Sequence, residues 1–251
     1  MGELEERWRD VTNVVGRLMA EHVSQFITPI SKVISEDYGE LLGTGSYVQL
    51  RGRPYLLTNE HVARCRDKHP LAHLPIPDDF FKGGVHPFQM QRFPIDAAIA
   101  RLDDAIMEKA TQRPIPAARI ASKHAPVMHE LLFMAGFPGK RARFSALAGA
   151  LATTTVPFLT QQVPEDSVTS PEHFRLNYNP ERARSVDSRG TFLPEPPGFS
   201  GSLVWDTGYV RKRGQNWSPT DATVTGLVFG WPRSDQSNSL MQHASKWSGY
   251  F

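Results

Sequence analysis

One serine of this chain stands where small residues would expose its hydroxyl group. Ser200 lies in residues 198–202, Gly-Phe-Ser-Gly-Ser, which run directly into the apolar residues 203–205. Small neighbours let a second chain approach the hydroxyl, and backbone N–H groups beside it can face a developing oxyanion. Glycine and serine also gather in ordinary hairpin turns. By itself, this stretch therefore fits either a nucleophile or a plain turn.

A nucleophilic serine needs a base and a carboxylate from elsewhere in the chain. A neutral imidazole must accept the hydroxyl proton, and a buried carboxylate must fix the imidazole tautomer. Among nine histidines, His61 stands out because an apolar strand predicted over residues 55–58 delivers it. Asp96 begins the next apolar stretch, whereas Asp103 and Asp104 follow that stretch, where a solvated turn explains them. The other eight histidines are interpreted as structural or solvent-facing.

The chain order His61, Asp96, Ser200 separates this arrangement from two other serine hydrolase layouts. Subtilisin-type enzymes carry the order Asp, His, Ser, and α/β-hydrolases carry Ser, Asp, His. Only His243 follows Ser200, and Ser202 stands where an α/β-hydrolase would have glycine. The order therefore argues against an esterase of the α/β-hydrolase class.

Five short motifs in this order resemble those of chymotrypsin/trypsin-type serine proteases, specifically the bacterial, disulfide-free branch related to the HtrA proteases. The resemblance runs from about residue 30 to residue 235. The motifs are Gly43-Thr44-Gly45-Ser46, Thr58-Asn59-Glu60-His61-Val62, Ile95-Asp96-Ala97-Ala98-Ile99, Ala135-Gly136-Phe137-Pro138 and Gly198-Phe199-Ser200-Gly201-Ser202.

The resemblance implies a serine endopeptidase that hydrolyses protein or peptide substrates without a cofactor. In such an enzyme Ser200 is the nucleophile that forms an acyl-enzyme, His61 acts as general base and then acid, and Asp96 orients the imidazole. The N–H groups of Gly198 and Ser200 form the oxyanion hole. The alternative is a non-catalytic module that holds a peptide on the same fold.

The implied fold is all-β, with two packed six-stranded antiparallel β-barrels and an N-terminal helix. We expect the helix in residues 1–28, a first barrel with the His and Asp in residues 29–110, and a second barrel with the Ser in residues 111–251. The plentiful glycine and proline, 19 and 20 residues, suit short strands and turns.

The helix itself follows from hydrophobic periodicity. Apolar residues recur at spacings of three and four, which predicts a helix over residues 3–27, and Pro29 ends it. It either packs on its own domain or docks a partner protein. The periodic residues are Trp8, Val11, Val15, Leu18, His22 and Phe26.

Substrate contacts are expected on both sides of the serine. The strand that contains Phe229, Gly230 and Trp231 resembles the one that pairs with the substrate backbone by strand addition. Pro194 stands six residues before Ser200, where trypsin-like members place an acid, and Glu195 is a fallback acid. We therefore expect no strong preference for arginine or lysine.

Two departures from the family pattern concern control of the serine. Phe199 replaces the acid that pairs with a newly cut N-terminus in zymogen-activated members, so we expect no activation of that kind. The long loop over residues 179–197 precedes the serine. It suggests gating of the site by a substrate or by a regulatory protein partner.

The composition of the chain indicates the cellular compartment in which the protein works. The 251 residues contain one cysteine, which favours a reducing compartment, and the first residues lack the apolar core of a signal peptide. No apolar run reaches the length of a membrane span. We therefore expect a cytoplasmic protein that does not act at a membrane. The net charge of +2 and the scattered basic clusters do not call for a nucleic-acid partner.

A metal site is not expected. Cys65, His69 and His73 lie close in sequence and suggest zinc, but Pro70 breaks the helix that such spacing needs.

Overall fold

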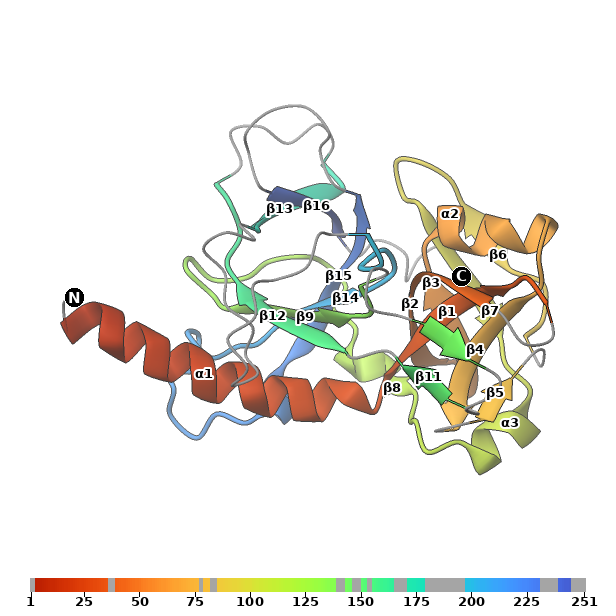
Figure 1. The fold of residues 1–251 in the computed structure, drawn as a ribbon. Coiled ribbons are helices and arrows are strands. Elements are labelled where there is room, and N and C mark those ends of the chain that lie inside the picture. The colour runs from red at the N-terminus through yellow and green to blue at the C-terminus, as the bar shows by residue number, and fades with distance from the viewer. Residues whose placement is uncertain are drawn as a thin grey trace.

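The structure is a computed structural model. It describes residues 3–35, 39–76, 79–81, 85–138, 143–145, 150–152, 155–164, 171–178, 197–230 and 239–244. Two largely antiparallel sheets lie side by side, and the N-terminal helix α1 runs along one of them towards the other (Figure 1). No helix in the described ranges is long and apolar enough to cross a membrane.

Helix α1 spans Glu3–Ser24 and buries one stripe of side chains. Val15, Met19 and Val23 recur every fourth residue and are at most 1 % exposed, as expected for the core-facing side of an amphipathic helix. Phe26 follows the helix and stacks on Trp205 of the second sheet, with 5.8 Å between ring centroids. The predicted helix is confirmed, and its buried stripe packs on its own chain.

The first sheet carries the segment that contains His61 and Asp96. It has eight strands rather than six: seven form one continuous path, and β8 adds a short parallel pair to β2. Within the described residues, no ladder joins β5 to β6 at its two edges. In sheet order the strands are β5 (Asp79–Phe81), β4 (Leu71–Ile76), β1 (Ile27–Val33), β2 (Gly39–Leu50), β3 (Arg53–Thr58), β7 (Ala97–Arg101) and β6 (Gln89–Gln91), with β8 (Ile115–Pro116) beside β2.

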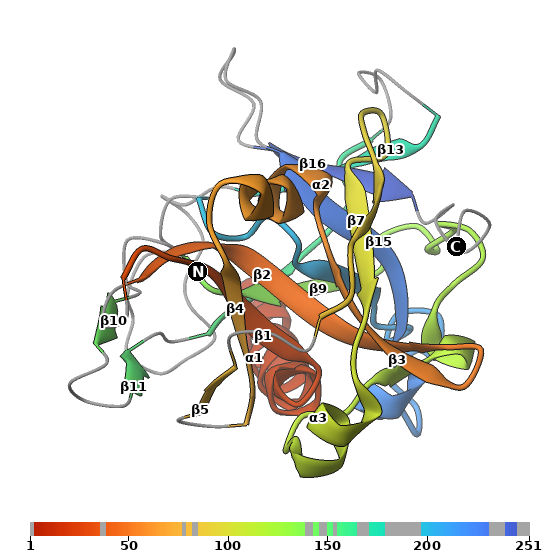
Figure 2. The same ribbon diagram turned by 90° about the vertical axis from the view of Figure 1, so that its right-hand side faces the viewer.

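Short helices fill the connections of this sheet. The helix α2 (Glu60–Ala63) and the 3-10 turn η1 (Arg64–Asp67) follow β3, and α3 (Asp104–Lys109) follows β7. Figure 2 shows α2 above the face formed by β2, β3 and β7. Strands β4, β5 and β6 lie within residues 66–94, a stretch rich in proline. They are short and lie towards the sheet edges, where proline is tolerated.

The second sheet carries Ser200 just before β14. It has the expected six strands, all antiparallel, and an isolated bridge between Gln162 and Leu176 links its edges. The hairpin of β10 (Arg143–Ser145) and β11 (Ala150–Ala152) is separate. In sheet order the strands are β12 (Val156–Thr160), β9 (Leu132–Gly136), β14 (Leu203–Asp206), β15 (Thr223–Gly230), β16 (Ser239–Ala244) and β13 (His173–Asn177).

One hydrophobic core joins the two sheets. Leu57 and Ile99 of the first sheet belong to the same buried cluster as Phe133, Leu203 and Trp205 of the second. Close packing of this kind fixes the position of one sheet relative to the other, because protein interiors leave few voids that would let the sheets slide. Residues carried by different sheets are therefore held in register across the interface.

Candidate active site

The Ser200 turn is built by two glycines and tied to β15. Gly198 and Gly201 have φ angles of 104° and 87°, in the left-handed region that glycine adopts without a steric penalty. The Ser202 N–H donates to the Phe199 carbonyl at 2.9 Å and closes the turn. The Gly201 N–H donates to the Val228 carbonyl at 2.9 Å.

The side chain of Phe199 anchors the Ser200 turn in the hydrophobic core. It is fully buried in the core of the second sheet and meets Tyr178 edge to face, with 6.1 Å between ring centroids. The next residue, Ser200, is partly exposed. A buried aromatic ring therefore holds the turn in place.

Asp96 holds His61 with both carboxylate oxygens. The His61 backbone N–H donates to Oδ1 at 3.0 Å, and Nδ1 lies 2.7 Å from Oδ2. Because the carboxylate accepts at Nδ1, the proton sits there and the lone pair of Nε2 is left available. The imidazole is 38 % exposed and the carboxylate 12 %, so the ring reaches solvent while the carboxylate is sheltered.

The backbone around Asp96 explains that placement. The N–H groups of Ile95 and Asp96 both donate to the Arg92 carbonyl, at 3.0 and 3.2 Å, and Asp96 takes a φ of 45°. Left-handed backbone is uncommon outside glycine, and aspartate is among the residues that tolerate it best. The Asn59 side chain also donates to the Asp96 carbonyl at 2.8 Å, so a hydrogen bond links the start of α2 to the aspartate turn.

Gly43 allows the Ser200 turn to lie close to helix α2, which contains His61. A Cβ on this glycine would lie 2.7 Å from the Ser200 carbonyl oxygen and 3.0 Å from Val62 Cγ2. The Thr44 N–H donates to the same Ser200 carbonyl at 2.7 Å. Ser200 and Val62, the neighbour of His61, therefore both lie close to the position that a side chain on this glycine would take. In the described residues, no hydrogen bond joins the Ser200 hydroxyl to His61.

The N–H groups predicted for the oxyanion hole are available. Neither the Gly198 nor the Ser200 N–H donates to another described residue, whereas those of Gly201 and Ser202 are both used. Two N–H groups with no partner among the described residues, beside a partly exposed serine, can meet an oxyanion.

The structure describes two of the five predicted substrate-binding residues, Phe229 and Gly230. Phe229 and Gly230 are partly exposed and end β15 just past Val228, whose N–H and carbonyl are used by the serine turn. A Cβ on Gly230 would meet nothing within 4 Å, so the space that a side chain would take there is open, while the backbone pairs with Met241 of β16. Trp231, Pro194 and Glu195 lie outside the described residues, as does most of the 179–197 loop.

Sequence reasoning missed His173, which crosses between the sheets beside this site. It is 5 % exposed, its Nε2 donates to the Pro94 carbonyl at 2.8 Å, and its ring lies 4.8 Å from that of Phe229. It also touches the ring of the exposed Phe93, with 5.8 Å between centroids. No motif pointed to this histidine, because its role depends on a contact between segments 79 residues apart.

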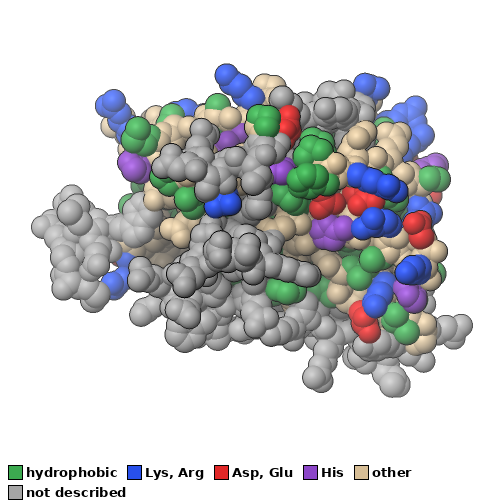
Figure 3. Space-filling view, turned by 90° about the horizontal axis from the view of Figure 1, so that it is seen from above, with side chains coloured by type: hydrophobic (Ala, Val, Ile, Leu, Met, Phe, Trp, Pro, Cys, Tyr) green, Lys and Arg blue, Asp and Glu red, His purple; other side chains and the backbone are tan. Residues whose placement is uncertain are grey.

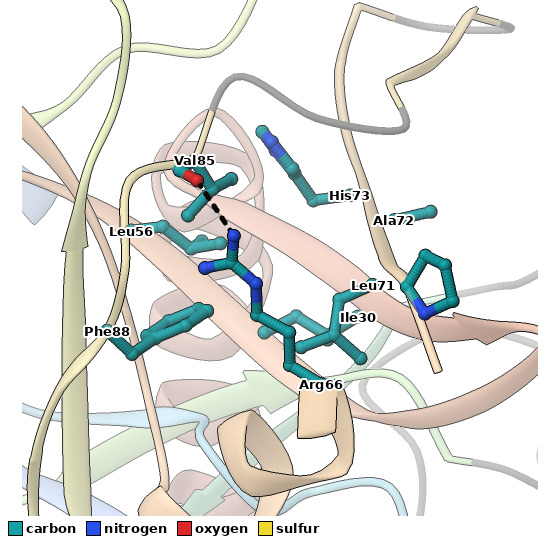
Figure 4. Close-up of a pocket in the computed structure, with 9 residues that line it drawn as sticks. Ile30, Leu56, Arg66, Leu71, Ala72, His73, Val85 and Phe88 are labelled. Atoms are coloured by element: carbon teal, nitrogen blue, oxygen red, sulfur yellow. Dashed lines mark hydrogen bonds between the residues drawn. The ribbon is translucent and has the colours of Figure 1, made fainter. Parts of the chain in front are cut away.

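A cavity of about 170 Å³ lies in the first sheet, away from these residues. Arg66 reaches across it and donates to the Val85 carbonyl at 3.4 Å (Figure 4). His73 lines the cavity and bonds the Tyr47 hydroxyl through Nδ1 at 2.8 Å. In the described ranges, no three potential ligands gather around a metal position.

Charges of both signs mix on the upper face, where Figure 3 shows basic, acidic and histidine side chains next to one another on the right. Glu60 beside His61 is 6 % exposed, and its carboxylate lies 3.7 Å from Arg64 and 3.9 Å from Arg92. The negative charge next to the imidazole is therefore partly offset by two guanidinium groups.

Comparison with known proteins identifies the fold. No protein-family model and no curated protein matches the sequence. Among solved structures, the active form of the Rv3671c protease from M. tuberculosis superposes with a TM-score of 0.51 at 15 % identity, over 94 % of this chain and 83 % of that one. The chain has a chymotrypsin-like fold. The scabies mite inactivated protease paralogue S-I1 has a TM-score of 0.51 at 11 % identity, over 91 % of this chain and 92 % of that one. The fold is therefore shared with an active protease and with an inactivated paralogue, and activity must be argued from the residues.

Proposed function

We propose that this protein is a serine endopeptidase. The observation that carries the proposal is the pair of hydrogen bonds between Asp96 and His61, which leaves Nε2 of the imidazole available. The helix that bears His61 faces the Ser200 turn across Gly43. A merely structural histidine would not need its tautomer fixed by a sheltered carboxylate while its ring stayed partly open to solvent.

In the proposed mechanism, Ser200 Oγ attacks the scissile carbonyl carbon and His61 Nε2 accepts its proton. Asp96 stabilises the imidazolium that forms, and the Gly198 and Ser200 N–H groups bind the oxyanion. His61 then protonates the leaving amine, and water hydrolyses the acyl-enzyme by the same route. A substrate strand added beside Phe229 and Gly230 would present the scissile bond to the serine. These steps need no cofactor.

Several finer expectations belong to this proposal. The Gly43-Thr44-Gly45 and Thr58-to-Val62 motifs support the bacterial, disulfide-free branch related to the HtrA proteases. The single cysteine, Cys65, is unpaired, which is in keeping with work in the cytoplasm. Control of the site by a regulatory protein partner or by the substrate itself stays part of the proposal.

The second candidate is a non-catalytic peptide-binding module. The likeness to an inactivated protease paralogue keeps it open, because the same fold occurs without activity. Such a module would hold a peptide beside Phe229 and Gly230 at the end of β15 and would not depend on Ser200.

A fluorophosphonate probe separates the two candidates. The probe should label Ser200, located by peptide mass spectrometry, and Ser200→Ala or His61→Ala should abolish labelling. Ser202→Ala is the matched control, because this buried neighbour has no predicted part in catalysis. A folded wild-type chain that binds peptides but is never labelled would support the binding module instead.

A further inference from the structure

The hydroxyl of Thr44 is a polar centre shared by three distant segments. It donates to the Gly198 carbonyl at 2.9 Å and accepts the Phe137 N–H at 3.1 Å. Thr44 itself lies in β2 and is fully buried. Its side chain therefore links the first sheet to the serine turn and to the turn that follows β9.

The backbone of Thr44 is committed to the same place. Its N–H donates to the Ser200 carbonyl at 2.7 Å, and its carbonyl accepts the Thr58 hydroxyl at 2.8 Å. Thr58 stands three residues before His61. One residue thus contacts the serine turn through both its backbone and its side chain, and reaches the end of the strand that presents the histidine.

The Gly198 carbonyl lies between the two oxyanion donors. It belongs to the peptide that joins Gly198 to Phe199, with the Gly198 N–H on one side and the Ser200 N–H on the other. Gly198 has no Cβ to restrict its backbone, so neighbouring contacts must choose its conformation. Two contacts do so: the Thr44 hydroxyl holds the carbonyl, and the buried Phe199 ring holds the next residue.

The space around the hydroxyl leaves little freedom. A Cβ on Gly136 would lie 2.9 Å from Thr44 Oγ1 and 2.8 Å from the Phe199 ring. The Thr44 hydroxyl, the Phe199 ring and the β9 turn are therefore packed against one another. Removing the hydroxyl while keeping the side-chain shape would leave the Gly198 carbonyl and the Phe137 N–H buried without this partner.

We propose that Thr44 is a positioning residue, whose hydroxyl sets the orientation of the oxyanion-hole N–H groups by holding the Gly198 carbonyl. This role rests on the proposed peptidase function. It differs from simple structural support in its consequence, because a misdirected oxyanion hole weakens binding of the transition state more than binding of the substrate.

Thr44→Val and Thr44→Ser form the test pair, since valine keeps the shape and serine keeps the hydroxyl. Peptide hydrolysis should show kcat for Thr44→Val lowered about 10- to 100-fold with KM little changed. Thr44→Ser should stay within about threefold of the wild type in kcat, because the hydroxyl is retained. The rate of fluorophosphonate labelling should follow kcat.

Thr225→Val is the matched control for stability. Thr225 is 1 % exposed, and its hydroxyl bonds His124 Nδ1 at 2.7 Å, outside the proposed site. This variant should lower the free energy of unfolding without changing kcat. A folded Thr44→Val chain with wild-type kcat, or equal losses in Thr44→Val and Thr44→Ser, would overturn the positioning role.

Thr44→Cys serves if the valine variant does not fold, because a thiol is a weaker hydrogen-bond donor. Its kcat should fall between those of the serine variant and an inactive chain, and an unchanged kcat would overturn the positioning role. Wild-type labelling keeps the two proposals apart. A folded wild-type chain that is never labelled overturns both the peptidase proposal and the role of Thr44. A labelled wild type together with a Thr44→Val variant of unchanged kcat overturns only the role of Thr44.

Discussion

Asp96 binds His61 twice, once at the backbone and once at the ring. Its Oδ1 accepts the His61 N–H at 3.0 Å, and its Oδ2 lies 2.7 Å from Nδ1. The first contact fixes where α2 begins relative to the aspartate, and the second fixes the tilt and tautomer of the imidazole. A single carboxylate therefore sets both the position and the protonation of the proposed base.

Asp96→Asn should separate these two effects. The amide can still accept the backbone N–H, but an NH₂ group facing Nδ1 favours the wrong imidazole tautomer. Labelling of Ser200 should fall about 10³- to 10⁴-fold while the fold is kept, as measured by probe kinetics and circular dichroism. Asp103→Asn is the control, because Asp103 forms an exposed pair with His86 at 3.1 Å and its loss should leave labelling unchanged. A fully active Asp96→Asn chain would remove the basis for the proposed base.

Gly201→Ala should damage the site through close contact. A Cβ there would lie 2.0 Å from the Thr44 carbonyl oxygen and 2.5 Å from Thr58 Oγ1, on backbone with a φ of 87°. Gly52→Ala is the control, since Gly52 has a φ of 77° but nothing within 4 Å of its Cβ. The control should cost about 1–2 kcal/mol of unfolding free energy from backbone strain alone. Gly201→Ala should cost more and abolish labelling, and equal costs in urea titrations would contradict the contact argument.

Much of the site is local in sequence, and that part could be predicted. His61 follows an apolar strand, Asp96 begins another, and Ser200 sits in a glycine turn, so each is placed by its own neighbours. The sequence also predicted the N-terminal helix, because its hydrophobic period is regular over six turns.

The remainder depends on contacts between distant segments. Nothing near Thr44 or His173 indicates that their partners are Gly198 and Pro94, since those pairs are 154 and 79 residues apart. Strand β16 also depends on distant partners. It lies in a polar tail and forms by pairing with β13 and β15, so its strand structure comes from neighbours rather than from its own pattern.

Phe199→Ala should destabilise the turn by opening a cavity in the second sheet. The ring is fully buried, so the loss should be about 3–5 kcal/mol in the free energy of unfolding, measured in urea. Labelling should fall as well, because the next residue is Ser200. Since burial rather than a terminal amine holds this turn, trimming the N-terminus should not raise the labelling rate. A trimmed chain with higher activity than the full chain would contradict this account.

His173→Phe should weaken the contact between the two sheets beside the proposed substrate-binding residues. Phenylalanine keeps a ring against Phe229 but loses the bond to the Pro94 carbonyl, two residues before Asp96. One neutral hydrogen bond contributes about 1 kcal/mol, so we expect labelling to fall about fivefold. His173→Gln keeps a donor and should recover most of that loss. Equal labelling rates in the two variants would show that the bond does not matter.

His124 should make stability fall as the pH falls. Burial lowers the pKa of His124 to about 4, against a smaller opposing effect from its bond to Gln162. The neutral ring stacks on Phe174 with 3.6 Å between centroids, donates to Gln162 Oε1 at 2.9 Å and accepts the Thr225 hydroxyl at 2.7 Å.

The unfolded chain takes up a proton at His124 below about pH 6.5, whereas the folded chain takes it up only near pH 4. The free energy of unfolding should therefore drop by about 3 kcal/mol between pH 7 and pH 4 from this residue alone. Urea titrations across that range measure the drop. His124→Gln should be less stable than the wild type at pH 7, because it loses the stacked ring, but its stability should change less with pH. An equally steep pH dependence in the variant would assign the effect to other groups.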